Sequence, residues 1–166
     1  MHDPDIVFVD NTDKVVSHGS RTECITAGFT ARISRVFILD SSGSVLLQQR
    51  QTGAWDQSAG GHVDYGESYH QAAIRELHEE MGITKKRLKL IGSFYSSDAT
   101  PYGKRHRFNR LYIGRYDGPV CIEPVEVMDY CWIRIKELDE LISSGAVTFT
   151  RGMLTSYELL RAYLEK

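Results

Sequence analysis

The chain has 166 residues, of which 42% are hydrophobic and 25% are charged, which suits one folded domain and excludes a disordered chain. The formal net charge of −2 excludes a global basic field, so no nucleic-acid polymer is expected as a partner. Cys24, Cys121 and Cys131 show no CxxC spacing, and their odd number argues against a disulfide framework.

The start of the chain lacks the basic residues of a signal peptide. No apolar run approaches the roughly 20 residues that span a bilayer. Cysteines without partners also fit a reducing compartment. We therefore expect a cytoplasmic protein, either a monomer or a homodimer, that has no membrane partner.

The first predicted element is a β-hairpin at the N-terminus. Ile6–Val9 and Lys14–Val16 are rich in β-forming residues and flank Asp10–Asp13, a cluster of turn formers. No linker or internal repeat divides the chain. We therefore expect a single domain over residues 1–166, with residues 1–30 as an N-terminal hairpin extension.

Further strands and helices follow along the chain. Strands are predicted at Arg35–Leu39, Val45–Gln49, Lys89–Ile91, Ser93–Ser96, Arg107–Arg115 and Tyr130–Ile133. The clearest helix spans Tyr69–Met81, because Ser68 and Gln71 match a capping box and Gly82 supplies a left-handed stop. Two more helices are predicted at Lys136–Ser143 and Met153–Leu164. Strands with helices outside them indicate a layered α/β domain.

The first helix carries three acidic residues at helical spacing. Glu76, Glu79 and Glu80 stand at i, i+3 and i+4, so they fall on one face. Like charges so placed repel by about 0.2–0.5 kcal/mol per pair. A divalent cation would offset this repulsion, since Mg²⁺ prefers carboxylate oxygens. A solvated acidic face remains the alternative from spacing alone.

The neighbouring residues favour the cation site. Gly60 and Gly61 precede the helix, and paired glycines let a backbone carbonyl approach a metal or substrate closely. Arg75 lies next to Glu76 and four residues before Glu79, so it can form a helix-spaced ion pair. Such a charge orients a carboxylate and keeps it ionised.

Residues 61–83 resemble the catalytic signature of the Nudix hydrolase family. The Nudix box reads G-x5-E-x7-R-E-U-x-E-E-x-G-U, where U is a bulky aliphatic residue. All of its specified positions are matched here, by Gly61, Glu67, Arg75, Glu76, Leu77, Glu79, Glu80, Gly82 and Ile83. The resemblance implies the Nudix fold, an α/β/α sandwich with a mixed β-sheet.

The resemblance also implies a metal site. In similar enzymes the glutamates that match Glu79 and Glu80 bind a divalent metal, Mg²⁺ or Mn²⁺. The glutamate that matches Glu76 contributes to the same site, often through water. The carbonyl just before the box glycine, here that of Gly60, completes the coordination.

The implied chemistry is metal-assisted hydrolysis of a phosphoanhydride bond. Glu76, Arg75 and Glu79 are the implied catalytic residues, with Glu76 helping to deprotonate the attacking water and Arg75 orienting that carboxylate. Glu67 and Gly61 support the cluster. The family's usual substrate is a nucleoside diphosphate linked to another group, so we expect a small diphosphate metabolite.

A second resemblance covers the residues before the box. Val45–Arg50 and Trp55–His62 are similar to the isopentenyl-diphosphate-isomerase-like branch of the family. True isomerases carry a catalytic cysteine just before the box glycine, where this chain has Gly60. Isomerase activity is therefore the disfavoured alternative. A non-catalytic nucleotide- or protein-binding module is the other, although such modules typically lose box glutamates.

Two residues outside the box are additional candidates. Arg50 ends a predicted strand and could contact a phosphate, although an ordinary surface arginine explains it equally well. Glu126 could supply a further acidic ligand or base, with a solvated acidic loop as the alternative. Substrate specificity is expected to come from loops such as Ser97–Lys104.

Overall fold

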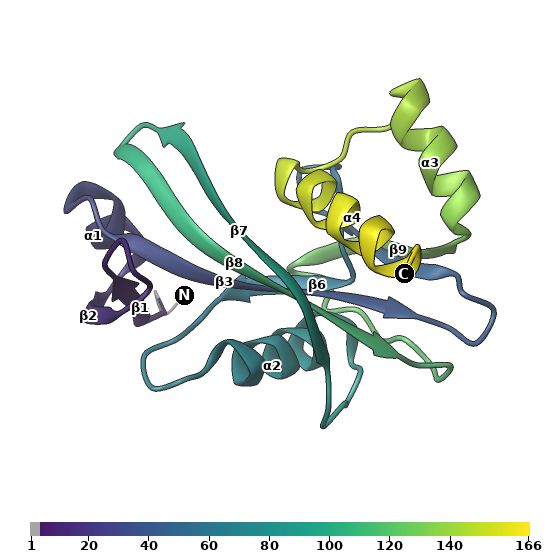
Figure 1. The fold of residues 1–166 in the computed structure, drawn as a ribbon, viewed down its shortest axis with the longest axis horizontal. Helices are drawn as coiled ribbons and strands as arrows, with labels where there is room; N and C mark the ends of the chain where they lie inside the picture. Colours follow the sequence, from purple (N-terminus) through teal and green to yellow (C-terminus); the bar gives the residue numbers. More distant parts are fainter. Residues whose placement is uncertain (1–3) are drawn as a thin grey trace.

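The computed structural model describes residues 4–166, which form nine strands and four helices (Figure 1). The strands are β1 (Ile6–Val9), β2 (Val15–Gly19), β3 (Thr30–Leu39), β4 (Val45–Arg50), β5 (Trp55–Asp56), β6 (Ala59–His62), β7 (Lys89–Thr100), β8 (Gly103–Arg115) and β9 (Val127–Ile133). The helices are α1 (Arg21–Thr26), α2 (Tyr69–Met81), α3 (Ile135–Ser144) and α4 (Arg151–Leu164). All these strands belong to one mixed sheet, in which β3 pairs in parallel with β8 and antiparallel with β1, β4 and β6.

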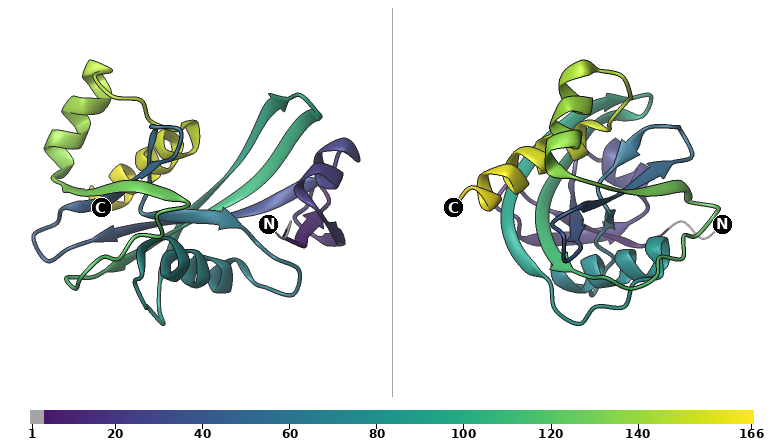
Figure 2. Two further views of the ribbon diagram at one scale, coloured as in Figure 1. Left: turned by 180° about the vertical axis from the view of Figure 1, so that it is seen from behind. Right: turned by 90° about the vertical axis from the view of Figure 1, so that its right-hand side faces the viewer.

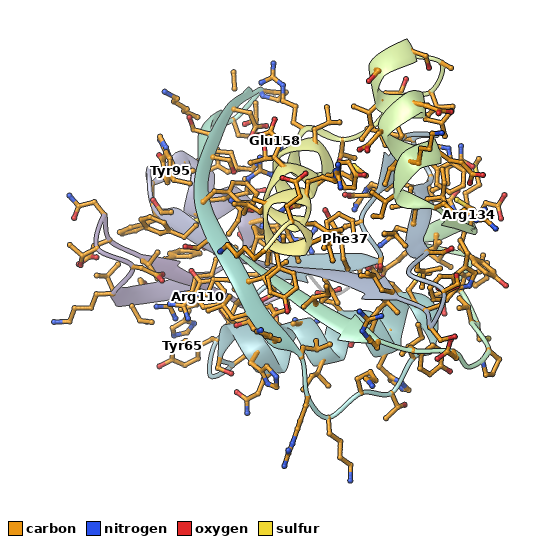
Figure 3. The ribbon with its side chains drawn as sticks, turned by 45° about the vertical axis from the view of Figure 1, so that its right-hand side comes forward. Phe37, Tyr65, Tyr95, Arg110, Arg134 and Glu158 are labelled. Carbon is orange, nitrogen blue, oxygen red and sulfur yellow. The ribbon has the colours of Figure 1, made fainter. Side chains whose placement is uncertain are left out.

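Helices cover both faces of the sheet, α2 on one side and α3 with α4 on the other (Figure 2). Strand β3 supplies both cores, because successive side chains of a strand point to opposite faces. Val36 and Ile38 join the core under α2. Phe37 and Leu39 join the core under α3 and α4, where Phe37 meets Tyr157 edge-on with ring centroids 6.4 Å apart (Figure 3). The expected α/β/α sandwich with a mixed sheet is confirmed.

Strands β7 and β8 form one long hairpin. The expectation of a loop at Ser97–Lys104 is wrong, because both strands continue in register to a turn at Pro101 and Tyr102. This outer part of the hairpin is polar, and Asp98 binds Arg105 across it. Strands are predicted from alternating apolar side chains, and this polar segment has none. Here the strands are held by ladder hydrogen bonds and charged pairs instead, which the sequence pattern does not reveal.

The N-terminal hairpin is present as β1 and β2, and β1 continues the main sheet through the pairing of Phe8 with Ala31. Helix α1 was not predicted. Ser20 accepts a hydrogen bond from the Glu23 backbone N–H, while the Glu23 side chain accepts one from the Ser20 N–H. This S-x-x-E capping box is a readable signal, but six residues are too few to show a helical period.

The two predicted C-terminal helices are confirmed. Those at Lys136–Ser143 and Met153–Leu164 correspond to α3 and α4, which begin one and two residues earlier. Both helices pack on the face of the sheet opposite α2 (Figure 1). None of the helices in residues 4–166 is both long and apolar enough to cross a bilayer.

Candidate active site

Helix α2 has the local structure that its sequence predicts. Ser68 accepts a hydrogen bond from the Gln71 backbone N–H, and the Gln71 side chain accepts one from the Ser68 N–H. Gly82 ends the helix with a left-handed φ of 65°. Ala73 and Met81 are fully buried against the sheet, which fixes the rotation of the helix and hence the position of its acidic face.

Arg75 is the centre of the acidic cluster. It binds Glu67 with two nitrogens, Nε at 2.7 Å and Nη2 at 2.9 Å. Its Nη1 donates to Glu76 at 2.8 Å and to Glu79 at 3.2 Å. Asp64 lies 3.6 Å from Nη2. The hydrogen bond with Glu67 is the main reason that the pKa of Arg75 is raised, so this cation stays charged and holds its partners in place.

Glu80 points the other way, into the protein, where its side chain is only 4% exposed. One of its oxygens, Oε2, accepts hydrogen bonds from Gln48 Nε2 at 2.8 Å and from the Gly60 backbone N–H at 3.0 Å. Burial, followed by the charge of Glu76, raises the pKa of Glu80 to about 8. The two hydrogen bonds only partly offset the loss of water.

The three box glutamates therefore occupy different environments. Burial raises the pKa of Glu76, and the ion pair with Arg75 opposes that effect. Glu79 keeps half of its side chain exposed, and among residues 4–166 its polar partner is Arg75. Glu80 is buried, and in the described part of the chain its hydrogen-bond partners are the uncharged Gln48 side chain and the Gly60 N–H. Glu79 is thus the carboxylate that is free to turn, whereas Glu76 and Glu80 are fixed.

The paired glycines make the close packing of β6 possible. Gly60 and Gly61 pair with Arg35 and Ser34 of β3. A Cβ atom at Gly61 would overlap the carboxylate of Glu76. A Cβ atom at Gly60 would lie 2.9 Å from Gln57 Nε2 and 3.0 Å from the Ser34 carbonyl oxygen. The glycines therefore bring the backbone of β6 directly against the acidic face of α2.

Both additional candidates lie within electrostatic range of the cluster. Arg50 ends β4, donates from Nη1 to Asp56 Oδ2 at 3.3 Å, and lowers the pKa of Glu80. Glu126 is exposed in the turn before β9, and its charge raises the pKa of Glu76. Both residues lie outside the box in sequence, and the fold brings them near the acidic cluster of α2.

Comparison with known proteins identifies the family to which this fold and site belong. Residues 30–152 match the NUDIX domain family. The chain belongs to the Nudix family. It is 34% identical over 157 residues to an isopentenyl-diphosphate Delta-isomerase of Serratia proteamaculans (strain 568), which covers 90% of this chain and 87% of that protein. An uncharacterized Nudix hydrolase of Yersinia pestis is 28% identical over 158 residues, with 92% and 82% covered.

The solved structures agree with this assignment at the level of the fold. DR0079 from Deinococcus radiodurans superposes with a TM-score of 0.71 at 22% identity, covering 95% of this chain and 98% of that one. The Nudix fold is therefore confirmed, as is the likeness to the isopentenyl-diphosphate-isomerase-like branch. The relatives include both isomerases and hydrolases, and the complete Nudix box marks this chain as an enzyme of the family.

The chemistry of the Nudix carboxylates fits a divalent cation. Carboxylate oxygens are the ligands that Mg²⁺ prefers, and the pKa values of Glu76 and Glu80 are raised first by burial and also by the negative charge of neighbouring glutamates. Within residues 4–166, no group of three or more His, Cys, Asp or Glu residues is already arranged to hold a metal ion. Arg75 holds oxygens of Glu76 and Glu79 instead. Arg75 thus engages one oxygen of each of these two carboxylates.

Sequence reasoning missed two residues of this site. Gln48 was not predicted, although a polar residue that follows the buried Val45, Leu46 and Leu47 is a signal that something polar faces it. Asp64 was also missed, because a single aspartate in a turn resembles many others. Its position is set by contact with Arg75, which the local sequence does not encode.

Proposed function

We propose that this Nudix enzyme hydrolyses a phosphoanhydride bond in a nucleoside diphosphate derivative or a similar small diphosphate metabolite, using Mg²⁺ or Mn²⁺. The observation that carries the proposal is that all three box glutamates of α2 are present and that they differ in burial and pKa. Glu76 and Glu80 are buried with raised pKa values, and Glu79 is exposed beside them. Such an arrangement is costly for folding unless a cation uses it.

The environment of each residue suggests its role in metal binding or in proton transfer. Glu79, Glu80, Glu76 and the carbonyl of Gly60 would hold the metal. When bound, Mg²⁺ supplies neutralising charge for the diphosphate and makes water more acidic. Arg75 engages Oε1 of Glu76, and no hydrogen bond from residues 4–166 holds Oε2, which can therefore accept a proton from the attacking water. The raised pKa of Glu76 makes it a stronger base than an exposed carboxylate.

The isomerase alternative is favoured by the 34% identity to a protein of that name. Against it stands Gly60, because a side chain there would press on Gln57 and on the Ser34 carbonyl. The buried Cys24 does not replace the missing cysteine, since it lies in α1 and burial raises the pKa of its thiol to about 11. The same effect raises the pKa of Cys131 in β9. Hydrolysis therefore agrees better with these residues.

A substrate panel tests the proposal. Nucleoside di- and triphosphates, dinucleotide polyphosphates, nucleotide sugars and isopentenyl diphosphate would each be incubated with Mg²⁺ or with EDTA. We expect phosphate-containing products from at least one anhydride, and only with the metal. Phosphorus NMR detects the product, and proton NMR detects any shift of the isopentenyl double bond. Isomerisation without phosphate release would overturn the proposal, and tight binding without turnover would support the binding-module alternative.

Gly61→Ala is expected to lower the hydrolytic rate by about 100-fold, because a displacement of about 1 Å in a reacting group costs that much. The new methyl group overlaps the Glu76 carboxylate and must push it away from its place beside Arg75. Steady-state kinetics give the loss in kcat, and circular dichroism checks the fold. Gly145→Ala is the matched control: it is strained by its φ of 64° but has open space around its Cβ and lies far along the chain. Equal effects of both substitutions on kcat would contradict the explanation.

A further inference from the structure

A small cavity, the α1 cavity, lies between α1 and the sheet, at the end of the molecule away from α3 and α4 (Figure 1). Part of its wall is apolar, because Ile6 of β1, Cys24 of α1 and Ala31 of β3 line it. These three side chains are at most 3% exposed and belong to one small core. Since Ala31 carries a single methyl group, α1 packs over β3 without filling the space between them.

The α1 cavity has room for a few atoms. The space open to the centre of a water molecule is about 40 Å³. One water needs about 10–15 Å³ of such space, so about three non-hydrogen atoms fit inside. A buried water normally makes about three hydrogen bonds, which the apolar wall does not offer. The inner part of the cavity therefore suits a short hydrocarbon group better than water.

The rest of the lining is polar, and its charges are positive. Arg21 begins α1, is exposed, and forms no ion pair within residues 4–166. Arg105 of β8 binds Asp98 through Nε and Nη2, whereas no described residue accepts a hydrogen bond from its Nη1. Among the described residues, no acidic side chain lines the cavity. The positive charge thus lies at the opening, and the buried apolar wall lies innermost.

His62 adds a hydrogen-bond donor to this lining. It pairs with Ile33, whose side chain shares a face of β3 with Ala31, so its ring points to the cavity side of the sheet. In the described part of the chain, neither ring nitrogen has a hydrogen-bond partner. Burial, followed by the charge of Arg21, lowers the pKa of His62 to about 3, and the other leading charges that act on it are also arginines. The ring is therefore neutral at pH 7, keeps one N–H donor and experiences a positive potential.

An apolar interior and a positive opening together select a ligand with a matching division between tail and head. We propose that the α1 cavity binds a small amphipathic anion, either a short-chain carboxylate or an alkyl phosphate ester. Its alkyl end lies against Ile6, Cys24 and Ala31, and its charged end meets Arg21 and the His62 N–H. This site uses no specified position of the Nudix box, so the inference goes beyond the proposed hydrolase function and does not depend on it.

A series of simple probes tests both halves of the ligand. Isothermal titration calorimetry of the full-length protein in EDTA would compare acetate, butyrate, 1-butanol and butylamine. We expect butyrate to bind at least tenfold more tightly than acetate, because two more CH₂ groups are buried. The alcohol and the amine should bind at least tenfold more weakly than butyrate, because they lack the anion. Methyl phosphate and propyl phosphate form a second series, and the tighter of butyrate and propyl phosphate identifies the head group.

Chain length distinguishes the cavity from a greasy surface. About three carbon atoms fit inside, so octanoate should bind no more tightly than butyrate. Affinity that keeps rising from butyrate to octanoate would show contact with an open apolar surface and would overturn the proposal. Failure of every carboxylate and phosphate ester to bind would overturn it as well.

Two variants separate the head from the tail. Arg21→Gln should weaken butyrate binding at least tenfold, and this exposed position leaves the fold unaffected. Ala31→Leu should fill the inner space and remove the preference for butyrate over acetate. Thermal unfolding checks that this buried substitution is tolerated, and the Arg21 variant keeps the test decisive if it is not. Equal butyrate affinity in Arg21→Gln and the unaltered protein would contradict the assignment.

Matched controls complete the experiment. Arg134→Gln makes the same chemical change at the start of α3, which lies far from α1 (Figure 1). Glu79→Gln alters the box and leaves the α1 cavity intact. Both variants should bind butyrate as the unaltered protein does. Butyrate binding by a protein that hydrolyses no diphosphate would leave this proposal in place and reject the hydrolase, so the two failures are distinguishable.

Discussion

Glu79→Gln is expected to reduce metal-dependent hydrolysis by more than about 100-fold while leaving the fold intact. Removing groups that merely support metal ligands costs about 10–100-fold, and Glu79 is proposed as a ligand itself. Glutamine keeps the shape of the side chain but removes the charge that a divalent cation requires. Half of this side chain is exposed, and its polar partner among the described residues is Arg75, which also binds Glu67 and Glu76, so the substitution leaves no buried group unsatisfied.

The measurement needs an exposed glutamate as a control. Glu158→Gln makes the same chemical change on the exposed side of α4 and should leave both kcat and the melting temperature unchanged (Figure 3). Titration calorimetry with Mg²⁺ would show whether the Glu79 variant has lost affinity, which separates a metal ligand from a residue that only helps in catalysis. Full activity and unchanged Mg²⁺ affinity in Glu79→Gln would remove this residue from the metal site.

The sequence predicted the parts of the site that depend on neighbouring residues. The capping box of Ser68 and Gln71, the stop at Gly82 and the shared face of Glu76 and Glu79 are all set within one helix. Helix geometry alone relates such positions, so spacing is enough to find them. The N-terminal hairpin and the two C-terminal helices follow from local patterns in the same way.

Local sequence patterns do not predict contacts between residues that are far apart in the sequence. Spacing placed Glu79 and Glu80 on one face, but the fold exposes the first and buries the second against Gln48, 32 residues earlier. Arg35 meets Asn109 across 74 residues, because β3 and β8 pair in parallel. A polar residue inside a strand signals that a partner exists, but only the strand pairing identifies which one.

Glu80→Gln is expected to change stability, unlike Glu79→Gln. It should stabilise the metal-free protein above pH 5. Glu80 Oε2 accepts the hydrogen bonds from Gln48 and Gly60, and the carbonyl oxygen of a glutamine can accept both. The substitution therefore keeps the contacts and removes the titrating group. Since one pKa unit corresponds to about 1.4 kcal/mol, the gain at pH 9 is at most about 5 kcal/mol.

The pH dependence follows from the pKa of about 8 that Glu80 has in the folded protein, against an ordinary value of 4.5. Below pH 4.5 the carboxyl group is protonated in both the folded and unfolded states, so it does not favour unfolding. As the pH rises from 4.5 to 8, the unfolded chain ionises first, and this destabilisation grows until the folded state also ionises. Thermal unfolding in EDTA from pH 5 to 9 should therefore show a decline in the unaltered protein that Glu80→Gln largely removes.

Magnesium affinity provides the complementary measurement. Between about pH 6 and 8, a cation that binds Glu80 must displace its proton, so the affinity of the unaltered protein should rise by up to tenfold per pH unit. Glu80→Gln should bind Mg²⁺ weakly at every pH and lose most activity, even though it is the more stable protein. The site would then hold a carboxylate that is unfavourable for folding and is retained for binding a cation. Parallel stability profiles for the two proteins across this range would show that Glu80 is already ionised in the metal-free fold.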